Sequence, residues 1–447
     1  MKLLYIVPYV PYPLNSGGNQ AFFTLTDNVR KRHELSILLY AHNKEDQDNI
    51  NALKALWKDV EFYVYDESKK EKEGNEDAED RFANMSWKDR ISCRFFLSIA
   101  QSMHRKIWRR QVRYVNKQMS STTEDLVRTR STLFAINRDI NADFCNYVQK
   151  VSALGFDAIQ IEFYEYLPLV YLLPSDTQKV FVHHEVRFVR NENELQLFRQ
   201  KEPTDIITFQ REKTFEISCL SAYDAVITLT ETDRKILSNF IAPSKLFVSP
   251  AVISIASSEQ LPFKPATELV FIGSGDHFPN ADAMIWFCRE IIPVLKKKLT
   301  KMPRLSIVGQ WRNEQKASIQ ALFPEANFTG YINDLPAFVN GKVSVVPVRI
   351  GSGMRIKILD SVFASAPIVT TTKGCEGIPM VNRENCLIAD DPKSFADAII
   401  EMLFDVRLQE RLSTNASATK KGMLNKAELI EKRLSVYKSL VNSSNLQ

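Results

Sequence analysis

Residues 343–372, VSVVPVRIGSGMRIKILDSVFASAPIVTTT, have the pattern of a strand, a glycine loop, a short helix and a second strand. The apolar, β-branched runs at 343–348 and 367–372 are typical of strands buried in a sheet. The Gly-Ser-Gly turn at 351–353 allows a ligand to approach the backbone closely, because glycine has no Cβ and tolerates positive φ. Apolar residues then recur at helical spacing, so the sequence predicts a helix that starts near Gly353 and packs on the sheet.

Two cations stand at the start of this predicted helix. Free N–H groups and the helix dipole make a helix N-terminus favourable for anions and unfavourable for cations. Arg355 and Lys357 therefore indicate a binding site for a di-anion such as a diphosphate. Asp360, one turn further on, could accept hydrogen bonds from ribose hydroxyls. The alternative is a solvated first turn in which Lys357 and Asp360 form an i,i+3 pair.

Three motifs in this region resemble a known family. They are R-I-G-S-G-M-R-I-K-I-L-D at 349–360, A-S-A-P-I-V-T-T at 364–371 and G-C-E-G-I at 374–378. They are similar to the donor site of retaining glycosyltransferases of family 4, a group 1 family with the GT-B fold. In that family a Glu-x7-Glu element places one acid on the transferred sugar and a second on the donor ribose. Asp360 stands at the second position, whereas Ser352 replaces the first acid, a departure that concerns the sugar contact rather than nucleotide binding.

The resemblance and the charges together predict the site residues. In the resembled enzymes a Gly-Gly pair near the N-terminus approaches the donor phosphates, a His followed by an acid or amide lines the interdomain cleft, and a segment after a strand of the second domain contacts the base. Catalytic roles are assigned to His184, Glu185, Arg355 and Lys357. Donor binding is assigned to Gly17, Gly18, Gly273, Tyr331, Ile332, Gly351, Ser352, Gly353, Asp360 and Glu376.

The N-terminal part of the chain has its own strand–turn–helix–strand rhythm. Strands are expected at 2–7 and 35–40, with a turn between them that is not G-x-G-x-x-G, so the dinucleotide fingerprint is absent. Another strand, 179–183, ends at His183-His184-Glu185, where ligands of open sheets bind. These residues could act as acid and base, hold a metal or be polar loop residues, but metal ligation needs a third ligand that is not visible nearby. His183, one residue earlier, is the alternative to His184 as the histidine that matches the one in the resembled family.

A strongly charged stretch interrupts this rhythm. Residues 67–80 carry many charges of both signs, and residues 88–117 hold nine basic residues and one acidic residue among aromatic and aliphatic ones. The pattern at 88–117 favours a basic amphipathic helix on an anionic membrane surface or a lipid-linked acceptor. It equally fits a helix that covers the domain core, whereas nucleic-acid contact is disfavoured.

The C-terminal part begins after a linker that the Pro- and Ser-rich composition places at 243–265. A second α/β series follows with a glycine turn at 273–275. Family members carry an Arg and a Lys after this turn to hold the diphosphate, but the segment SGDHFPNAD has neither. Arg355 and Lys357 must then supply the positive charge. The predicted domains are 1–250, with a helical insertion at about 66–150; 251–426, which binds the nucleotide-sugar; and a helix in 427–447 that crosses back.

Composition sets outer bounds on the function. The 447 residues are 45% hydrophobic and 25% charged, with a net charge of +5 and a pI of about 8.7. These values fit a soluble globular protein, and the charge is too small to indicate nucleic-acid binding. The six cysteines have no CxxC spacing, which favours reduced thiols, and no signal peptide or transmembrane run is recognised. We therefore expect a cytoplasmic protein, with association at the inner membrane face as an option.

These observations predict an α/β chain of GT-B fold, with two Rossmann-like doubly wound domains that face a cleft. The resemblance implies a glycosyltransferase that moves a sugar from a nucleoside-diphosphate sugar to a glycan or lipid-linked acceptor with retention. No D-x-D stands at a strand end, so no metal or other cofactor is expected. A nucleotide-sugar epimerase or phosphorylase-like enzyme of the same fold and a non-catalytic sugar-nucleotide-binding protein are the alternatives. A dinucleotide oxidoreductase is disfavoured.

Overall fold

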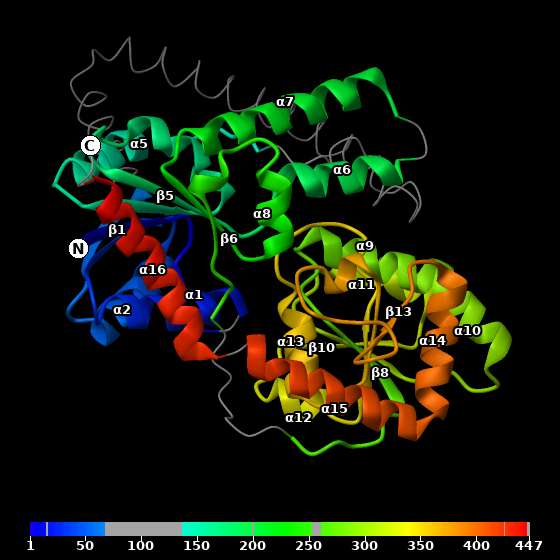
Figure 1. Ribbon diagram of the computed structural model, residues 1–447. Helices are drawn as coiled ribbons and strands as arrows, with labels where there is room; N and C mark the ends of the chain where they lie inside the picture. Colours follow the sequence, from blue (N-terminus) through cyan, green and yellow to red (C-terminus); the bar gives the residue numbers. More distant parts are fainter. Residues whose placement is uncertain (15–16, 68–135, 199–200, 253–260, 424, 445–447) are drawn as a thin grey trace, which may run out of the picture.

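The computed structural model describes residues 1–14, 17–67, 136–198, 201–252, 261–423 and 425–444. The predicted basic segment at 88–117 and the charged segment at 68–80 lie outside these residues. Two α/β domains stand side by side, each built on one parallel sheet (Figure 1). We call the unit around the first sheet the N-terminal domain and the unit around the second sheet the C-terminal domain.

The sheet of the N-terminal domain has the strand order β3-β2-β1-β4-β5-β6-β7, and every neighbouring pair is parallel. Its strands are almost continuously apolar, as expected for strands covered by helices on both faces. The strands are β1 (Lys2–Val7), β2 (Glu34–Ala41), β3 (Glu61–Asp66), β4 (Ala158–Glu162), β5 (Gln178–His183), β6 (Ala225–Thr228) and β7 (Leu246–Val248).

The sheet of the C-terminal domain has the order β10-β9-β8-β11-β12-β13, again with parallel pairs only. Both sheets thus wind outward in two directions from a central pair of strands, as doubly wound folds do. The predicted α/β class with two such sheets is confirmed. The strands are β8 (Glu268–Ile272), β9 (Leu305–Val308), β10 (Ala326–Gly330), β11 (Lys342–Val346), β12 (Ile368–Thr370) and β13 (Leu387–Ile388).

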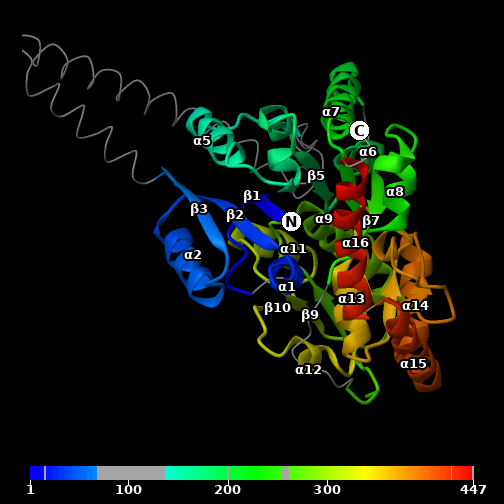
Figure 2. The ribbon, with the colours of Figure 1, turned by 60° about the vertical axis from the view of Figure 1, so that its left-hand side comes forward.

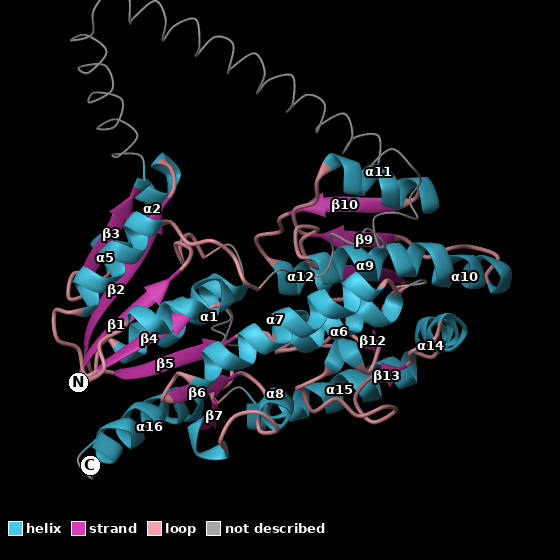
Figure 3. Ribbon diagram, turned by 90° about the horizontal axis from the view of Figure 1, so that it is seen from above, coloured by secondary structure: helices cyan, strands magenta, loops and turns pink. Residues whose placement is uncertain are grey.

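Helices cover both faces of each sheet (Figure 3). In the N-terminal domain they are α1 (Gly17–Val29), α2 (Lys44–Leu56), α5 (Ala142–Ser152), the 3-10 helices η3 (Tyr164–Leu172) and η4 (Pro243–Lys245), α6 (Arg187–Leu197), α7 (Pro203–Ser221) and α8 (Glu231–Leu237). In the C-terminal domain they are α9 (Phe278–Trp286), the π-helix η5 (Phe287–Ile291), α10 (Ile292–Lys298), α11 (Asn313–Leu322), α12 (Leu335–Val339), α13 (Ile356–Phe363), the 3-10 helix η6 (Lys373–Cys375), α14 (Pro392–Phe404) and α15 (Val406–Met423).

The last helix, α16 (Lys426–Ser444), leaves the C-terminal domain and packs on the N-terminal one, beside α1 (Figure 2). Its apolar residues Leu429, Leu434 and Tyr437 are buried in the same hydrophobic cluster as residues of strands β1 and β2. The chain therefore crosses between the domains twice. The second crossing lies near residue 425 and ties the C-terminal helix to the first sheet.

Two local expectations were wrong. The helix after the glycine turn begins at Ile356 rather than near Gly353, because Gly353 has φ of +80° and Arg355 has the non-helical backbone of an N-cap. The predicted linker at 243–265 begins later than expected, after residue 248, because residues 243–248 form η4 and β7. Strand β7 pairs with β6 at the edge of the sheet. Turn-forming residues hid a three-residue strand that pairs with β6.

Within the described ranges, no helix combines the length and the apolar character that crossing a bilayer requires. The five cysteines that the structure describes are free thiols: Cys145, Cys219, Cys288, Cys375 and Cys386.

Candidate functional site

The carboxyl ends of the two sheets point toward each other (Figure 3). In each sheet the strand order reverses between two central strands, β1 and β4 in the first and β8 and β11 in the second. Ligands of open α/β sheets bind beyond the carboxyl ends of strands at such reversal points. The loops that follow β8 and β11 contain the two predicted glycine turns, 273–275 and 351–353. The topology therefore brings both predicted turns to the place where a ligand is expected.

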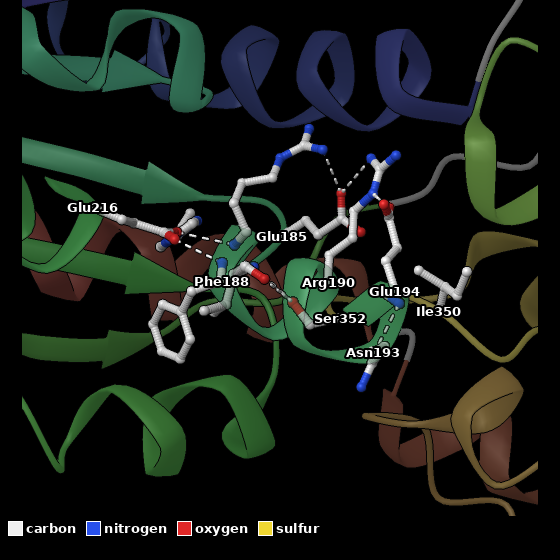
Figure 4. A network of polar contacts seen from close by, with 12 residues as sticks. Glu185, Phe188, Arg190, Asn193, Glu194, Glu216, Ile350 and Ser352 are labelled. Atoms are coloured by element: carbon white, nitrogen blue, oxygen red, sulfur yellow. Dashed lines mark hydrogen bonds and ion pairs between the residues drawn. The ribbon is translucent and has the colours of Figure 1, made fainter. Parts of the chain in front are cut away.

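The 351–353 turn is held by the N-terminal domain (Figure 4). The Ser352 hydroxyl accepts a hydrogen bond from the Val186 N–H at 2.6 Å. Gly351 donates through its N–H to Asn193 Oδ1 at 3.2 Å, and Gly353 donates to Asp233 Oδ2 at 3.1 Å. Residue 352, the position that departs from the family pattern, thus binds the opposite domain in this structure.

Glycine is required at both ends of this turn. Gly353 has φ of +80°, and a Cβ there would lie 2.2 Å from the His184 carbonyl oxygen. Gly351 has φ of +112°, and a Cβ there would lie 2.8 Å from Glu185 Oε1. At Gly353 the neighbouring atom belongs to the backbone, so any side chain there would force the two domains apart at this contact. At Gly351 the neighbouring atoms are the ends of flexible side chains, and the positive φ is what favours glycine.

Glu185 is a buried carboxylate surrounded by cations. Its Oε2 lies 3.0 Å from Arg187 Nη1 and 3.7 Å from Arg190 Nη1. Burial opposes ionisation, but Arg187, Arg190, His277 and Arg355 outweigh it and lower the pKa of Glu185 to about 2. Its other oxygen, Oε1, has no hydrogen-bond partner among the described residues. Glu185 therefore keeps a full negative charge and one unused acceptor beside the glycine turn.

Arg355 stands at the N-cap position of α13 and is buried. Its Nη1 donates to the Ser352 carbonyl, and its Nη2 lies 3.5 Å from the Ile350 carbonyl oxygen. Its Nε is buried and has no hydrogen-bond partner in the described part of the chain. A buried guanidinium with an unused donor is a group that an anionic ligand can satisfy.

Lys357 lies two residues further along and joins the two glycine turns. Its Nζ donates to Asn280 Oδ1, and Asn280 Nδ2 donates to the Ser274 carbonyl at 2.8 Å. Nζ also lies 4.5 Å from the centre of the Phe271 ring. Burial and the charge of Arg355 lower the pKa of Lys357 to about 7, while burial raises the pKa of Asp360 to about 7. The predicted cations and the carboxylate thus lie close together at the start of α13.

The structure distinguishes the two histidines, His183 and His184, either of which could correspond to the cleft histidine of the resembled family. His183 is buried, with Nε2 at 2.8 Å from Glu216 Oε1. His184 keeps 28% of its side chain exposed, with Nε2 at 2.6 Å from Glu162 Oε2. His183 therefore belongs to the core, and His184 is the histidine that a ligand can reach.

Glu216 fixes the start of α6. Besides His183, it accepts hydrogen bonds from the N–H groups of Arg187 at 2.9 Å and Phe188 at 2.8 Å (Figure 4). It thus satisfies two free donors at the helix N-terminus from a fully buried position on α7. This carboxylate thus helps to hold the start of the helix that carries Arg187, Arg190 and Asn193.

We expect Glu216→Gln to lower the free energy of unfolding by about 2–4 kcal/mol, because the substitution weakens three hydrogen bonds to a buried charge. Denaturant titration followed by tryptophan fluorescence measures the change. The matched control is Glu231→Gln, which removes an exposed carboxylate at the start of α8 and should cost at most about 0.5 kcal/mol. Equal effects of the two substitutions would contradict the capping role of Glu216.

The remaining predicted residues lie at the edges of this region. Gly273 has φ of +155° and packs against the Asn280 side chain, where a Cβ would lie 2.6 Å away. Glu376 pairs with Lys373, and the adjacent Gly377 packs on Thr230 of the N-terminal domain. The structure places the others on two separate segments. Gly17 and Gly18 start α1. Tyr331 and Ile332 follow β10, where Tyr331 is half exposed and Ile332 packs on the small apolar cluster beside β8.

Several residues of the site were not predicted from the sequence. Asn193, Asn280 and Asp233 each lie inside a helix, where nothing marks them as different from surface polar residues. The helical periodicity could have placed Asn280 and Asp233 on the buried face. The packing of the two domains brings Asn193 and Asp233 to the 351–353 turn, whereas Asn280 binds the 273–275 turn within its own domain. Among the described residues, no group of three or more metal-binding side chains comes together.

The sequence comparisons point to one family. Residues 266–405 match the family model described as glycosyl transferases group 1. A curated relative, an uncharacterized 44.6 kDa protein in the cps region of Klebsiella pneumoniae, is 25% identical over 158 residues. That alignment covers 33% of this chain and 40% of the relative. The chain therefore aligns with less than half the length of this relative.

Several solved structures are similar in fold to this chain over nearly its whole length. TarM of S. aureus, solved with fondaparinux, α-GlcNAc-glycerol and UDP, has a TM-score of 0.60 at 13% identity, with 98% of this chain and 100% of that one covered. The sucrose-phosphate synthase of Thermosynechococcus elongatus has 0.61 at 12%, covering 99% and 100%. HepE of Anabaena, solved with UDP and glucose, has 0.60 at 10%, covering 98% and 100%. The chain thus has the predicted GT-B fold, and its C-terminal domain matches the glycosyl transferases group 1 family.

Proposed function

We propose that this protein transfers a sugar from a nucleoside-diphosphate sugar to a glycan or lipid-linked acceptor, with retention and without a required metal. The observation that carries the proposal is the pair of cations at the start of α13, the buried Arg355 and the partly buried Lys357. Lys357 is tied through Asn280 to the Ser274 carbonyl of the other glycine turn. The family match at 266–405 includes both cations, and the resemblance of 349–360 to retaining family 4 enzymes supports the finer assignment.

The geometry suits a diphosphate for electrostatic reasons. Arg355 has an unused buried donor, and the Lys357 ammonium has three N–H donors, of which Asn280 takes one. Charge-assisted hydrogen bonds from fixed donors stabilise a leaving diphosphate as negative charge develops on it. Asp360 lies one turn along the same helix and would bind the ribose. TarM and HepE, which share the fold, were solved with UDP, so uridine diphosphate sugars are the first donors to test.

Binding and turnover measurements test the proposal. Calorimetry with a panel of uridine and guanosine diphosphate sugars should identify one donor that binds in the presence of EDTA. NMR of the transfer product should then show the anomeric configuration of the donor. Conversion of the donor without any acceptor would favour an epimerase. Tight binding without transfer or hydrolysis would favour a non-catalytic sugar-nucleotide-binding protein.

Donor binding should weaken as the pH rises from about 6.5 to 8.5. The pKa of Lys357 is lowered to about 7, so the ammonium is lost as the pH rises through that value. Asp360, with its pKa raised to about 7, gains a negative charge over the same interval. Both changes disfavour a diphosphate, and each proton can change the affinity by at most about tenfold per pH unit. Calorimetry with UDP-glucose at several pH values measures this effect.

Two variants separate these contributions. In Lys357→Arg the side chain keeps its charge throughout this interval, so donor affinity should depend less steeply on pH. Asp360→Asn should remove the part of the pH dependence that comes from the Asp360 carboxyl group. A pH dependence that is the same in both variants as in the parent protein would contradict the assignment to these groups.

A role at a membrane surface is a separate proposal. The basic residues at 88–117 would bind anionic lipid and bring the enzyme to a lipid-linked acceptor in polysaccharide assembly. Sedimentation with anionic and neutral vesicles tests it, and equal binding to both kinds would contradict it.

A further inference from the structure

His184 is held on two sides by consecutive residues of the N-terminal domain. Glu162, the last residue of β4, places Oε2 at 2.6 Å from His184 Nε2. The ring of Phe163, the next residue, stacks on the imidazole with centroids 3.8 Å apart and planes 2° apart. Phe163 has φ of +65°, a conformation that costs energy for a bulky residue and persists where the surroundings impose it. The strained backbone at Phe163 thus goes together with a fixed His184 ring.

A series of hydrogen bonds runs from the C-terminal helix through the buried Glu162 carboxylate to His184. Tyr437 of α16 lies with its hydroxyl 2.6 Å from the Tyr5 hydroxyl and 2.6 Å from Gln160 Oε1. Gln160 Nε2 donates to Glu162 Oε1 at 2.6 Å. All four of these residues are at most 2% exposed. Within the described residues, the member of the series that solvent reaches is His184 itself, at its end.

The hydrogen bonds from Tyr437 to Gln160 and from Gln160 to Glu162 both donate toward Glu162. Burial raises the pKa values of Tyr5 and Tyr437, so both keep their protons, and Tyr437 donates to the Gln160 side-chain carbonyl. This contact orients the Gln160 amide so that its NH2 group faces Glu162. An ionised carboxylate has acceptors only, so an ionised Glu162 accepts one hydrogen bond from Gln160 and one from His184. Opposite an ionised Glu162, the proton of a neutral His184 lies on Nε2.

We propose that Glu162 is a positioning residue that fixes His184 in the Nε2–H tautomer, and that α16 takes part through Tyr437 and Gln160. The partly exposed His184 ring then presents Nδ1 as a hydrogen-bond acceptor for a hydroxyl of the bound donor sugar. This inference rests on the proposed transferase function. It adds three residues, Glu162, Gln160 and Tyr437, of which Tyr437 lies far along the chain from the site.

The tautomer can be measured without any substrate. In protein labelled with 15N at its six histidines, long-range 1H–15N spectra at a pH where the rings are neutral distinguish Nε2–H from Nδ1–H. A His184→Gln variant assigns the signal. We expect Nε2–H in the parent protein. In Glu162→Gln the new amide should turn its oxygen to Gln160 and its NH2 group to His184, so the tautomer should invert to Nδ1–H.

Turnover gives the second readout. We expect kcat/KM to fall at least about tenfold in Glu162→Gln and about threefold in Tyr437→Phe, which keeps its ring but frees the Gln160 amide to rotate. The matched control is Tyr223→Phe, which removes another buried hydroxyl, donated to the Leu167 carbonyl at 2.8 Å. This control should leave both the His184 tautomer and kcat/KM unchanged.

Each outcome decides a different question. An unchanged tautomer in Glu162→Gln, or equal effects of Tyr437→Phe and Tyr223→Phe, would overturn the positioning role. If Glu162→Gln does not fold, Tyr437→Phe still tests the series through the His184 signal. A shifted tautomer in a protein that neither binds nor turns over any sugar nucleotide would support the positioning role and contradict the transferase function.

Discussion

Replacing Gly353 with alanine should lower kcat/KM by at least about 100-fold. The new Cβ would lie 2.2 Å from the His184 carbonyl oxygen, and both partners are backbone-fixed atoms that cannot rotate away. The turn would have to leave the N-terminal domain, and the hydrogen bond from Gly353 to Asp233 would be lost with it. Displacing a catalytic group by about 1 Å is enough to cause a loss of this size. Steady-state kinetics with the identified donor measures the change.

Gly155 provides the matched control for this substitution. It has the same φ of +80°, but a Cβ there would meet nothing within 4 Å. Gly155→Ala should therefore show only the cost of an alanine at positive φ, about 1–2 kcal/mol of stability, with unchanged kcat/KM. Similar kinetics in the two variants would show that the 351–353 turn does not need its contact with His184.

Removing both cations at the start of α13 should cause the other large effect. In Arg355→Ala/Lys357→Ala, we expect donor affinity to fall by about 10²- to 10⁴-fold, because each charged hydrogen bond contributes about 1.5–3 kcal/mol. The single variants should each lose part of this amount, and kcat should fall as well, since the leaving diphosphate would lose its counter-charges. Calorimetry and steady-state kinetics on the same preparations separate the two losses.

The control must remove the same types of charge from the same domain. Arg383 forms an exposed ion pair with Glu401, and Lys393 lies in the first turn of α14. Arg383→Ala/Lys393→Ala should leave both donor affinity and kcat unchanged. If the two double variants bind the donor equally, the cations at α13 do not hold the diphosphate.

Much of the fold followed from local patterns. The runs at 343–348 and 367–372 became β11 and β12, and the glycine turn between them lies at the reversal point of the sheet. These predictions succeeded because parallel strands are buried on both faces and their apolar runs are therefore continuous. The exact start of α13 was not predicted, because Gly353 adopts positive φ where it approaches His184, a residue of the other domain.

The contacts between the domains could not be predicted from the sequence. Ser352 marks a departure from the family pattern, but nothing in the sequence indicates that its hydroxyl binds Val186. The sequence also could not show which of His183 and His184 a ligand can reach. The carboxylates that distinguish these two histidines come from α7 and β4. Single side chains that meet from distant segments leave no periodic signal, and only the packed structure shows them.

A crystal structure of the protein soaked or co-crystallised with UDP addresses the central assignment most directly. We expect the β-phosphate within hydrogen-bond distance of the Arg355 guanidinium and the Lys357 ammonium, with the ribose hydroxyls at Asp360. A nucleotide bound away from α13, or one whose phosphates contact neither of these two side chains, would contradict the account.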